Sequence, residues 1–436
     1  MCVQNSTKRK YIVLYDNLSY YLKLNRERRF TVNLRNLLLG DILLTLIFLE
    51  ETMPDKACVI RCESYHIKDV AAAVDRAFEL LGGIEKFICA EQKVLIKANL
   101  MRKSRPEDCC VTHPKVVEAI ASQVKKLGAT PIICDSPGGP YNASVLKSLY
   151  AATGALEAAK NSGAELNYDC SYVKMEIGGR VIKQIDIIRP ALEADVIIDV
   201  AKLKTHAHAT YTGAVKNMFG CVPGFEKAEL HFNYPGTEDF ANAIIDIAQR
   251  VKPCISFIDA VMAMEGNGPG SGEPRFVGAL VASESMYAAD IAAMRLANIR
   301  VEEVPIVKEA MSRGLSDGEV KLLGDDISEL IVKDFKRSDY VDNNVLRNRV
   351  PGFLAAPVSK WLALKPAIDK NLCIGCGVCE RICPSSTIQI KRGKARIRRK
   401  GCIKCFCCQE FCPKKAIVGK RNKIISAAIA VTEERK

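Results

Sequence analysis

The sequence predicts an α/β fold with a doubly wound, mostly parallel sheet, followed by a small α+β domain organised around cysteines. Between residues 53 and 320, apolar segments of strand length alternate with amphipathic segments of helix length. This alternation is typical of a parallel sheet with helices on both faces. Two cysteine-rich runs follow, on either side of residue 390. The 436 residues, 48% of them hydrophobic, are enough for two or three domains with a sizeable core.

The alternation begins at Met53. "MPDKACVIRC" predicts a strand, and "IKDVAAAVDRAFELLGG" predicts an amphipathic helix that ends at glycine. "KVLIKAN" predicts a buried strand, and the next helix is expected to start at Pro114 with Thr112 or His113 as its cap. Further strands are expected at "TPIICD", 194–203, 254–260 and 276–282, and further helices at 142–162, 212–219, 237–251 and 288–299.

These patterns divide the chain into segments. The predicted boundaries are 1–52 for an extension or a misread start, 53–320 for the α/β domain, 321–364 for a connector, 365–420 for the cysteine-rich domain, and 421–436 for a basic tail. The apolar stretch from Leu37 to Leu49 contains Asp41 and is shorter than the roughly 17 to 25 residues that a membrane span needs. We therefore expect no membrane span.

The two cysteine runs predict iron–sulfur clusters. "CIGCGVCERICP" (373–384) and "CIKCFCCQEFCP" (402–413) share the spacing C-x2-C-x2-C-x3-C-P, the signature of bacterial two-cluster ferredoxins. In that arrangement the last cysteine of each run binds the cluster of the other run. The predicted ligands of two [4Fe-4S] clusters are Cys373, Cys376, Cys379 and Cys412 for one, and Cys402, Cys405, Cys408 and Cys383 for the other. Zinc ribbons fit less well, because they pair two C-x2-C hooks across a longer gap.

The net charge of +13 is concentrated at the carboxyl end. Residues 365–436 contain 18 Lys and Arg against 5 Asp and Glu, which accounts for the whole excess. Bound clusters with thiolate ligands are anionic, so nearby cations would help to hold them and to dock an acidic redox partner. A nucleic-acid partner is not expected, since "KRGKARIRRK" contains no aromatic residue on which bases could stack.

Cysteine usage predicts a reducing compartment. The eleven cysteines outside the assigned ligands are scattered through apolar contexts, as expected for free thiols rather than a disulfide framework. The amino terminus lacks the pattern of a signal peptide. We therefore expect a cytoplasmic protein.

Polar residues at the ends of the predicted strands form the candidate site, because ligands of open α/β sheets bind at the carboxyl ends of strands. The candidate catalytic residues are His206, Lys204, Asp135 and Glu265, and the candidate substrate-binding residues are Lys202, Lys216, Asn217, Asn99 and His113. Lysines beside His206 predict an anion pocket in which His206 transfers a proton.

Three alternatives stay open at this site. The segment 202–217 could be a solvated strand end, or His206 and His208 could bind a metal together with a further ligand such as His231. His113 could serve only as a helix cap.

The "GNGPGSG" loop lacks the spacing of a nucleotide-binding fingerprint and a helix after it, so it predicts either a mobile flap or a long turn.

Several motifs in order resemble a prokaryotic family named as a domain of unknown function, whose members often end in a bacterial-type ferredoxin domain. They are "MPDKACVIRCESY", "ELLGG", "VLIKANL", "THPKVVEA", "DSPGG", "KLKTHAHATYTGAVKNMFG" and "AMEGNGPGSGEP". The resemblance runs from Met53 to about Arg313 and from Cys373 to Pro413. It supports the domain order and the clusters and implies no substrate. Residues 1–52 and the fifth cysteine of the second run, Cys407, depart from the pattern.

Three functions remain. The clusters could exchange electrons with a small anionic substrate in the α/β domain, or the chain could be an electron carrier or assembly protein whose α/β domain only docks partners. The third is a non-redox enzyme with structural or sensing clusters. A cavity lined by Lys202, Lys204, His206 and Asp135 close to a cluster would favour the enzyme. Exposed clusters without such a cavity would favour the carrier.

Overall fold

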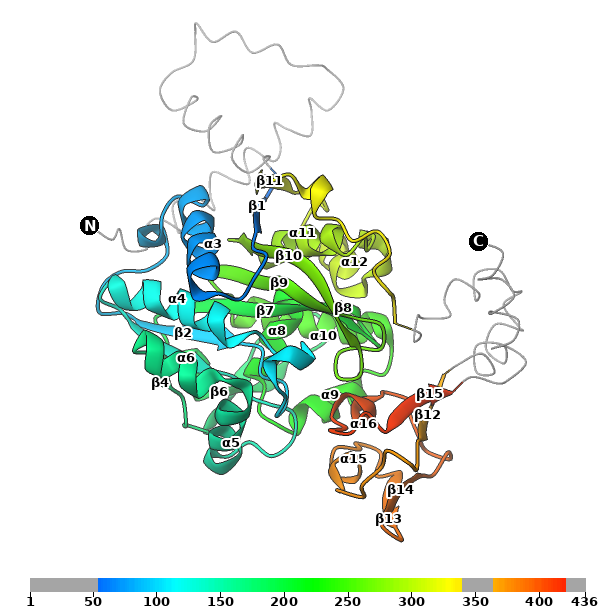
Figure 1. Ribbon diagram of the computed structural model, residues 1–436. Helices are drawn as coiled ribbons and strands as arrows, with labels where there is room; N and C mark the ends of the chain where they lie inside the picture. Colours follow the sequence, from blue (N-terminus) through cyan, green and yellow to red (C-terminus); the bar gives the residue numbers. More distant parts are fainter. Residues whose placement is uncertain (1–53, 339–363, 421–436) are drawn as a thin grey trace, which may run out of the picture. The chain divides into compact units, whose positions relative to one another are not determined.

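The computed structural model describes residues 54–338 and 364–420 (Figure 1). The predictions made for residues 1–52, for the stretch Leu37–Leu49, for most of the connector and for the basic tail therefore lie outside the described residues. Within these two ranges, no helix is long and apolar enough to cross a membrane.

The centre of residues 54–338 is a mixed, mostly parallel sheet. In the described residues it has nine strands in the order β11-β1-β10-β9-β7-β2-β3-β4, and β8 pairs with β7. The strands are β1 Lys56–Arg61, β2 Lys93–Ala98, β3 Thr130–Cys134, β4 Glu165–Leu166, β7 Val196–His206, β8 Thr210–Thr212, β9 Ile255–Glu265, β10 Glu273–Ser283 and β11 Lys321–Gly324. Only the pairs made by β10 and β8 are antiparallel. The predicted α/β class is confirmed.

Strand β11 corrects the predicted organisation. Residues 321–324 fall in the segment expected to be a connector, but they pair in parallel with β1 at the edge of the main sheet. Phe335 is buried in the core further along the same segment. A short strand of mixed polarity gives a weak sequence signal, which explains why the predicted α/β domain ended at residue 320, just before β11.

Helices cover both faces of this sheet (Figure 1). On one face lie α3 Ile67–Leu80, α4 Pro114–Lys126, α5 Ala143–Thr153 and α6 Ala155–Ser162. On the other lie α8 Ala214–Asn217, α10 Thr237–Arg250, α11 Met286–Leu296 and α12 Pro305–Ser312. The remaining elements are α7 Arg189–Glu193, α9 Glu226–Asn233, the hairpin β5 Tyr172–Glu176 with β6 Gln184–Ile188, and the 3-10 helices 84–86, 106–108, 218–221, 301–303 and 327–329.

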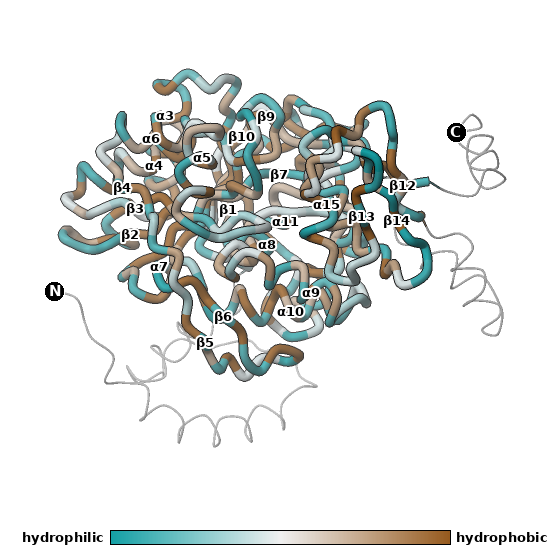
Figure 2. The backbone as a smooth tube through the Cα atoms, turned by 90° about the horizontal axis from the view of Figure 1, so that it is seen from below, coloured by the Kyte–Doolittle hydropathy of each residue, from teal (hydrophilic) through white to brown (hydrophobic). Residues whose placement is uncertain are grey.

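Side-chain periodicity accounts for this layering. In β2, Val94 and Ile96 belong to the core under α3 and α4, whereas Leu95 belongs to the core on the opposite face. The helices carry apolar and polar residues in alternation along the tube (Figure 2). Helix α4 starts with Pro114, and the Nδ1 atom of its cap residue His113 accepts a hydrogen bond from the Lys115 amide at 3.3 Å. The expected cap at His113 is therefore present.

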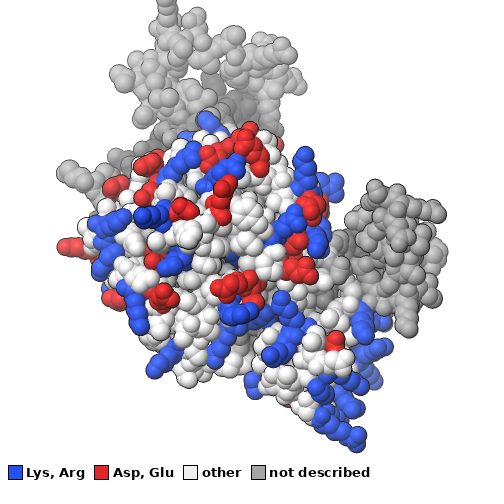
Figure 3. Space-filling view, viewed as in Figure 1, with Lys and Arg blue, Asp and Glu red and all other residues white. Residues whose placement is uncertain are grey.

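The C-terminal domain is small and has two short two-stranded sheets. Strand β12 (Lys365–Ile368) pairs with β15 (Ile417–Lys420), and β13 (Ile388–Lys391) pairs with β14 (Lys394–Ile397), both antiparallel. Each cysteine run contains one short helix, α15 Val378–Arg381 or α16 Cys407–Glu410. Lys and Arg side chains cover much of the visible face of this domain (Figure 3).

Candidate functional site

Two separate spaces in the C-terminal domain are each lined by four cysteines. One is lined by Cys373, Cys376, Cys379 and Cys412. The other is lined by Cys383, Cys402, Cys405 and Cys408. Each space therefore receives three cysteines of one run and the last cysteine of the other, which are the two sets that the spacing predicted. Four thiols around a largely apolar space are a donor set that fits a [4Fe-4S] cluster.

Backbone amides support this fit, because they donate to sulfur atoms in both spaces. The amides of Ala395 and Ala416 point at the sulfurs of Cys373 and Cys412, at 3.4 and 3.2 Å. The amide of Thr387 points at the sulfur of Cys383 at 3.4 Å. Hydrogen bonds to the ligating sulfurs help to set the reduction potential of such clusters.

A single-ion site is not formed by the side chains in residues 54–338 and 364–420. No three His, Cys, Asp or Glu side chains there converge closely enough to hold one ion. In a cubane each thiolate binds a different iron atom, so the four sulfurs do not need to converge in that way. The Nδ1 atom of His206 already accepts from the amides of His208 and Ala209, and the His231 ring stacks on Phe240 at 4.2 Å. These contacts argue against the alternative of a histidine metal site.

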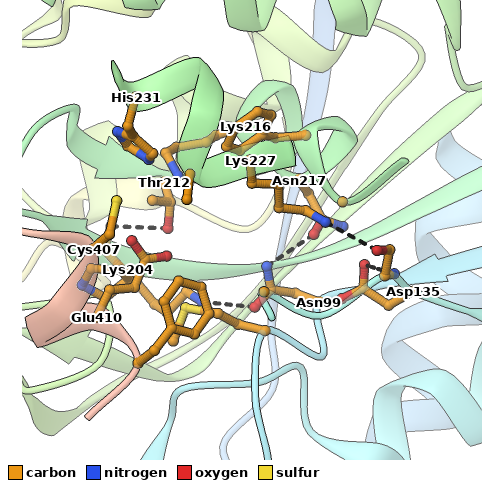
Figure 4. Close-up of a pocket in the computed structure, with 18 residues that line it drawn as sticks. Asn99, Asp135, Lys204, Thr212, Lys216, Asn217, Lys227, His231, Cys407 and Glu410 are labelled. Atoms are coloured by element: carbon orange, nitrogen blue, oxygen red, sulfur yellow. Dashed lines mark hydrogen bonds between the residues drawn. The ribbon is translucent and has the colours of Figure 1, made fainter. Parts of the chain in front are cut away.

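A cavity of about 60 Å³ lies at the carboxyl ends of the central strands, beside the C-terminal domain. It is lined by Asn99, Met101, Asp135, Ser136, Gly138, Lys204, Thr212, Lys216, Asn217, Phe219, Gly220, Lys227, Ala228, His231, Pro269, Cys407, Glu410 and Phe411. Figure 4 shows polar side chains from the central elements and from the C-terminal domain turned toward this space. The cavity has room for a few water molecules or a small ion.

Three lysines give this cavity an excess of positive charge. The Lys204 ammonium donates to the Asn99 side-chain oxygen at 2.7 Å and to the Cys110 carbonyl at 2.8 Å. Lys227, from α9, donates to the Ser136 hydroxyl at 3.1 Å. These acceptors are neutral. Burial lowers the pKa of Lys204 to about 8, that of Lys227 to about 7, and that of Lys216 below its usual value.

A chain of amides fixes the orientation of Lys204. The Asn217 amide nitrogen donates to Asp199 Oδ1 at 2.7 Å, so its oxygen is left to accept from the Asn99 amide at 2.9 Å. The Asn99 oxygen must then face Lys204. Burial raises the pKa of Asp199 well above its usual range. The hydrogen bond between Asp199 and Asn217 therefore determines that the side-chain oxygen of Asn99, and not its nitrogen, faces the Lys204 ammonium.

Asp135 lines the cavity, but its charge is already paired. Its Oδ1 atom lies 2.6 Å from the Lys97 ammonium, and both side chains are buried. It also accepts from the amides of Leu100 and Ser136. A Cβ atom on Gly220 would lie 2.3 Å from both Asp135 Oδ1 and Lys97 Nζ, so the pair requires glycine there. Asp135 thus shapes the cavity wall, and among the cavity lysines its charge raises the pKa of Lys227 against the larger lowering by burial.

The structure brings four further predicted residues to the cavity, namely Lys204, Lys216, Asn217 and Asn99. His206 lies behind the lining, with its Nε2 atom 4.0 Å from Glu410 Oε2. Burial, followed by the charge of Lys216, lowers its pKa well below the usual range, so the ring is neutral. Since Nδ1 accepts hydrogen bonds, the proton of this neutral ring is on Nε2.

Three predicted residues lie elsewhere, which corrects the expected layout of the pocket. Lys202 and Asp259 are register partners on adjacent parallel strands, and their charged atoms lie 2.8 Å apart. The His113 ring stacks on Tyr65, whose hydroxyl accepts from Lys202 and donates to Asp259. Glu265 accepts from the Lys336 amide at 3.0 Å. A position at the end of a strand predicts that a residue lies at the edge of the sheet. Whether its charged group faces the cavity depends on the residue it pairs with on the neighbouring strand, as Lys202 does with Asp259.

Sequence reasoning missed Lys227 and Thr212 in the central domain, and Cys407, Glu410 and Phe411 in the C-terminal domain. Lys227 lies in a helix of charged residues that has no strand-end signal. The position of Cys407 outside the ligand spacing was a usable signal, since its side chain lines this cavity rather than either four-cysteine space.

Residues of the second cysteine run contact the loops that follow β2, β3 and β9. Arg102 donates to the carbonyls of Cys412 at 2.7 Å and Gly270 at 2.6 Å. A Cβ atom on Gly138 would lie 2.0 Å from the Phe411 ring, and one on Gly270 would lie 2.2 Å from the Glu410 carbonyl. The glycines of "DSPGG" and "GNGPGSG" therefore allow close approach of the C-terminal domain. Whether the second loop also moves as a flap stays a prediction.

An α/β domain joined to a domain with eight cluster-type cysteines defines the class of this protein. Residues 94–295 match the family described as Domain of unknown function (DUF362), and residues 365–413 match the 4Fe-4S dicluster domain. The thylakoid-associated protein sll1697 of Synechocystis sp. is 33% identical over 274 residues, which cover 61% of this chain and 81% of that protein. The chain belongs to this DUF362 family, in the expected combination with a ferredoxin-type domain.

Two solved structures are similar to parts of this chain. The lactate racemase apoprotein of Thermoanaerobacterium thermosaccharolyticum has 15% identity and a TM-score of 0.33, with 54% of this chain and 56% of that chain covered. A structural-genomics protein of Thermotoga maritima has 10% identity and a TM-score of 0.36, with 56% of this chain and 62% of that chain covered. This chain therefore spans less than two thirds of either protein.

Proposed function

We propose that the protein is an iron–sulfur oxidoreductase that transfers electrons between two [4Fe-4S] clusters and a small anionic substrate in the cavity. The observation that carries this proposal is the composition of the cavity wall. Lys204, Lys216 and Lys227 share it with Cys407 and Glu410, which flank the cluster cysteines. When bound, the clusters supply single electrons, so a substrate held by these lysines would be close to its electron source.

The remaining side chains have roles that follow from their contacts. The lysines would bind the anion by charge-assisted hydrogen bonds, and Asn99 and Asn217 would keep Lys204 in place. Lys227 is suited to hold or release a proton near neutral pH, because burial brings its pKa to about 7. Asp135 and Gly220 would keep the floor of the cavity rigid.

An electron carrier is the second candidate, and one surface favours it. Cys376 is exposed, and Leu372 and Ile374 beside it are 49% and 58% exposed. An apolar patch with a basic surround fits a docking site for an acidic redox protein. Such a partner would also serve the oxidoreductase, because its electrons would reach the cavity through the C-terminal domain.

The proposed compartment is the reducing cytoplasm. No cysteine in residues 54–338 and 364–420 forms a disulfide, and the buried thiols of the α/β domain include Cys58 and Cys134. Thiols in this number fit a reducing environment better than an oxidising one.

Reoxidation of the reduced protein tests the proposed function. The anaerobic, cluster-loaded full chain would be reduced, mixed with a panel of small carboxylates and oxyanions, and followed by the visible absorbance of the clusters. We expect at least one anion to reoxidise the wild type about tenfold faster than Lys216→Met, because the variant loses a binding charge. Lys308→Met, at an exposed lysine of α12, is the matched control.

Equal rates in Lys216→Met and Lys308→Met would place electron transfer outside the cavity. If no anion reoxidised the protein, and electron transfer to a protein acceptor were unchanged in both variants, the electron-carrier function would be favoured.

A further inference from the structure

We propose that Glu410 makes the cavity selective for singly charged anions, so that one helix of the C-terminal domain both flanks the cluster ligands and selects the substrate by charge. This inference rests on the proposed anion cavity and deepens it, because it names the charge class of the substrate. It concerns binding alone and can fail or succeed separately from electron transfer.

The Glu410 carboxylate lines the cavity without a close cationic partner. Its side chain is 13% exposed. The basic side chain beside it is the neutral ring of His206, whose Nε2 atom is 4.0 Å from Glu410 Oε2. Among the residues that the structure describes, no lysine ammonium comes within ion-pair distance of it. Its backbone is held in place, because the Glu410 carbonyl accepts from Arg102 at 3.2 Å. The negative charge is therefore fixed in the cavity without being neutralised by contact.

The other carboxylate of the cavity wall does not act in this way. Asp135 is paired with Lys97 at 2.6 Å, so its charge is balanced within the wall. That leaves Glu410 as the carboxylate of the described lining without a lysine or arginine ion-pair partner, and it acts on Lys204 and Lys216. The carboxylate that acts on Lys227 is Asp135. The electrostatic influence of Glu410 on Lys216 and Lys204 raises the pKa of each, against the larger lowering by burial.

Charge and space together define the ligand. A volume of about 60 Å³ suits an anion of a few heavy atoms that shares the cavity with Glu410. The lysines attract both charges of a dianion and Glu410 repels both. Burial leaves Lys227 only partly charged near neutral pH, so repulsion from Glu410 offsets much of what the second charge gains from the lysines. Over the few ångströms of this cavity, one extra unit charge changes affinity by about tenfold or more. The expected ligand is a small monoanion, such as a monocarboxylate.

Perchlorate and sulfate test the inference, because they share a tetrahedral shape and differ by one charge. Their dissociation constants would be measured by calorimetry on the anaerobic, cluster-loaded full chain, in wild type, Glu410→Gln and Glu380→Gln. Glu380 is the matched control, because it lies on the other short helix, α15, and does not line the cavity. Comparing the ratio of the two constants between variants cancels differences in hydration.

We expect Glu410→Gln to shift the ratio toward sulfate by about tenfold, and Glu380→Gln to leave it unchanged. Iron content and far-ultraviolet circular dichroism would establish that each variant is intact, and Glu410→Ala provides a second test if the glutamine variant loses iron. An unchanged ratio in an intact variant would overturn the inference. The inference would also be overturned if neither perchlorate nor sulfate bound to the wild type.

Discussion

At the scale of single residues, burial determines what each charged group can do. The charges at the strand ends divide into those paired within the protein and those with only neutral partners. Lys202 is paired with Asp259 and Lys97 with Asp135, whereas Lys204 and Lys227 bond to neutral oxygens. Of these four lysines, Lys204 and Lys227 can offer a ligand an unpaired positive charge when they are protonated.

The Lys202–Asp259 pair should be structural. Both side chains are buried, so Asp259→Asn would leave an uncompensated ammonium group and should lower the free energy of unfolding by about 3–5 kcal/mol. Urea unfolding followed by circular dichroism measures this loss. Glu193→Gln, in an exposed pair with Arg189, is the control and should cost less than about 1 kcal/mol. A similar small loss in both variants would show that the buried pair is not needed.

Anion binding should depend on pH through the lysines. The pKa of Lys227 is about 7 in the folded protein, against the usual 10.5, so at pH 8 this group is largely uncharged. A bound anion favours the charged form, and the protein should therefore take up a proton on binding at pH 8. Calorimetry in two buffers of different ionisation enthalpy measures the uptake, which Lys227→Met should reduce. Binding without proton uptake would refute the low pKa.

The same shift has a consequence for stability. The unfolded chain holds the Lys227 proton between about pH 7 and 10.5, whereas the folded protein has released it. Lys227 should therefore make the free energy of unfolding rise with pH across this window. Lys227→Met should remove that part of the rise, and the two proteins can be compared by urea unfolding at each pH.

At the scale of elements, the loops after β2, β3 and β9 contact helix α16 and its flanks. Glycines in the second and third of these loops allow the close approach of protein atoms. The Gly270 contact is with backbone, which cannot rotate away as a side chain can. Long apolar strands and amphipathic helices could be predicted from the sequence, because their period is local. These loop contacts join residues more than a hundred positions apart and leave no period.

The Gly270 contact should be needed for close packing of α16. In Gly270→Ala the new Cβ atom would lie 2.2 Å from the Glu410 carbonyl, so we expect faster hydrogen exchange in residues 407–412. Gly236→Ala is the control, since its φ is −77° and the nearest atom to its Cβ lies at 3.5 Å. Unchanged exchange in Gly270→Ala would show that the contact yields at little cost.

At the scale of the whole molecule, the proposal joins a basic cluster domain to an anion cavity. The division of eight cysteines into two sets of four could be predicted from spacing alone, because cluster geometry imposes that spacing. The cavity could be predicted only in part. Lys204 lies near the carboxyl end of β7 and Asn217 in helix α8 shortly after it, but Lys227 and Glu410 reach the cavity from helices that carry no strand-end signal. Charge pairing across strands removed Lys202 from the predicted set.

Cluster content should follow the two cysteine sets. The loaded protein should contain about eight irons per chain, as two cubanes require. Cys407→Ser should keep this content, because Cys407 lines the cavity rather than a four-cysteine space, and Cys408→Ser should lose iron. Iron analysis and electron paramagnetic resonance measure both. The reverse pattern would show that the second cluster uses a different ligand.

If the cavity and a cluster form one functional centre, an anion in the cavity should change the potential of the cluster. A redox titration of the clusters by electron paramagnetic resonance measures this, with and without saturating acetate, in wild type and in Lys216→Met. An anion on the order of 10 Å from a cluster should lower its midpoint potential by about 50 mV or more, and Lys216→Met should abolish the shift at the same acetate concentration. Identical potentials with and without bound acetate in the wild type would contradict the claim.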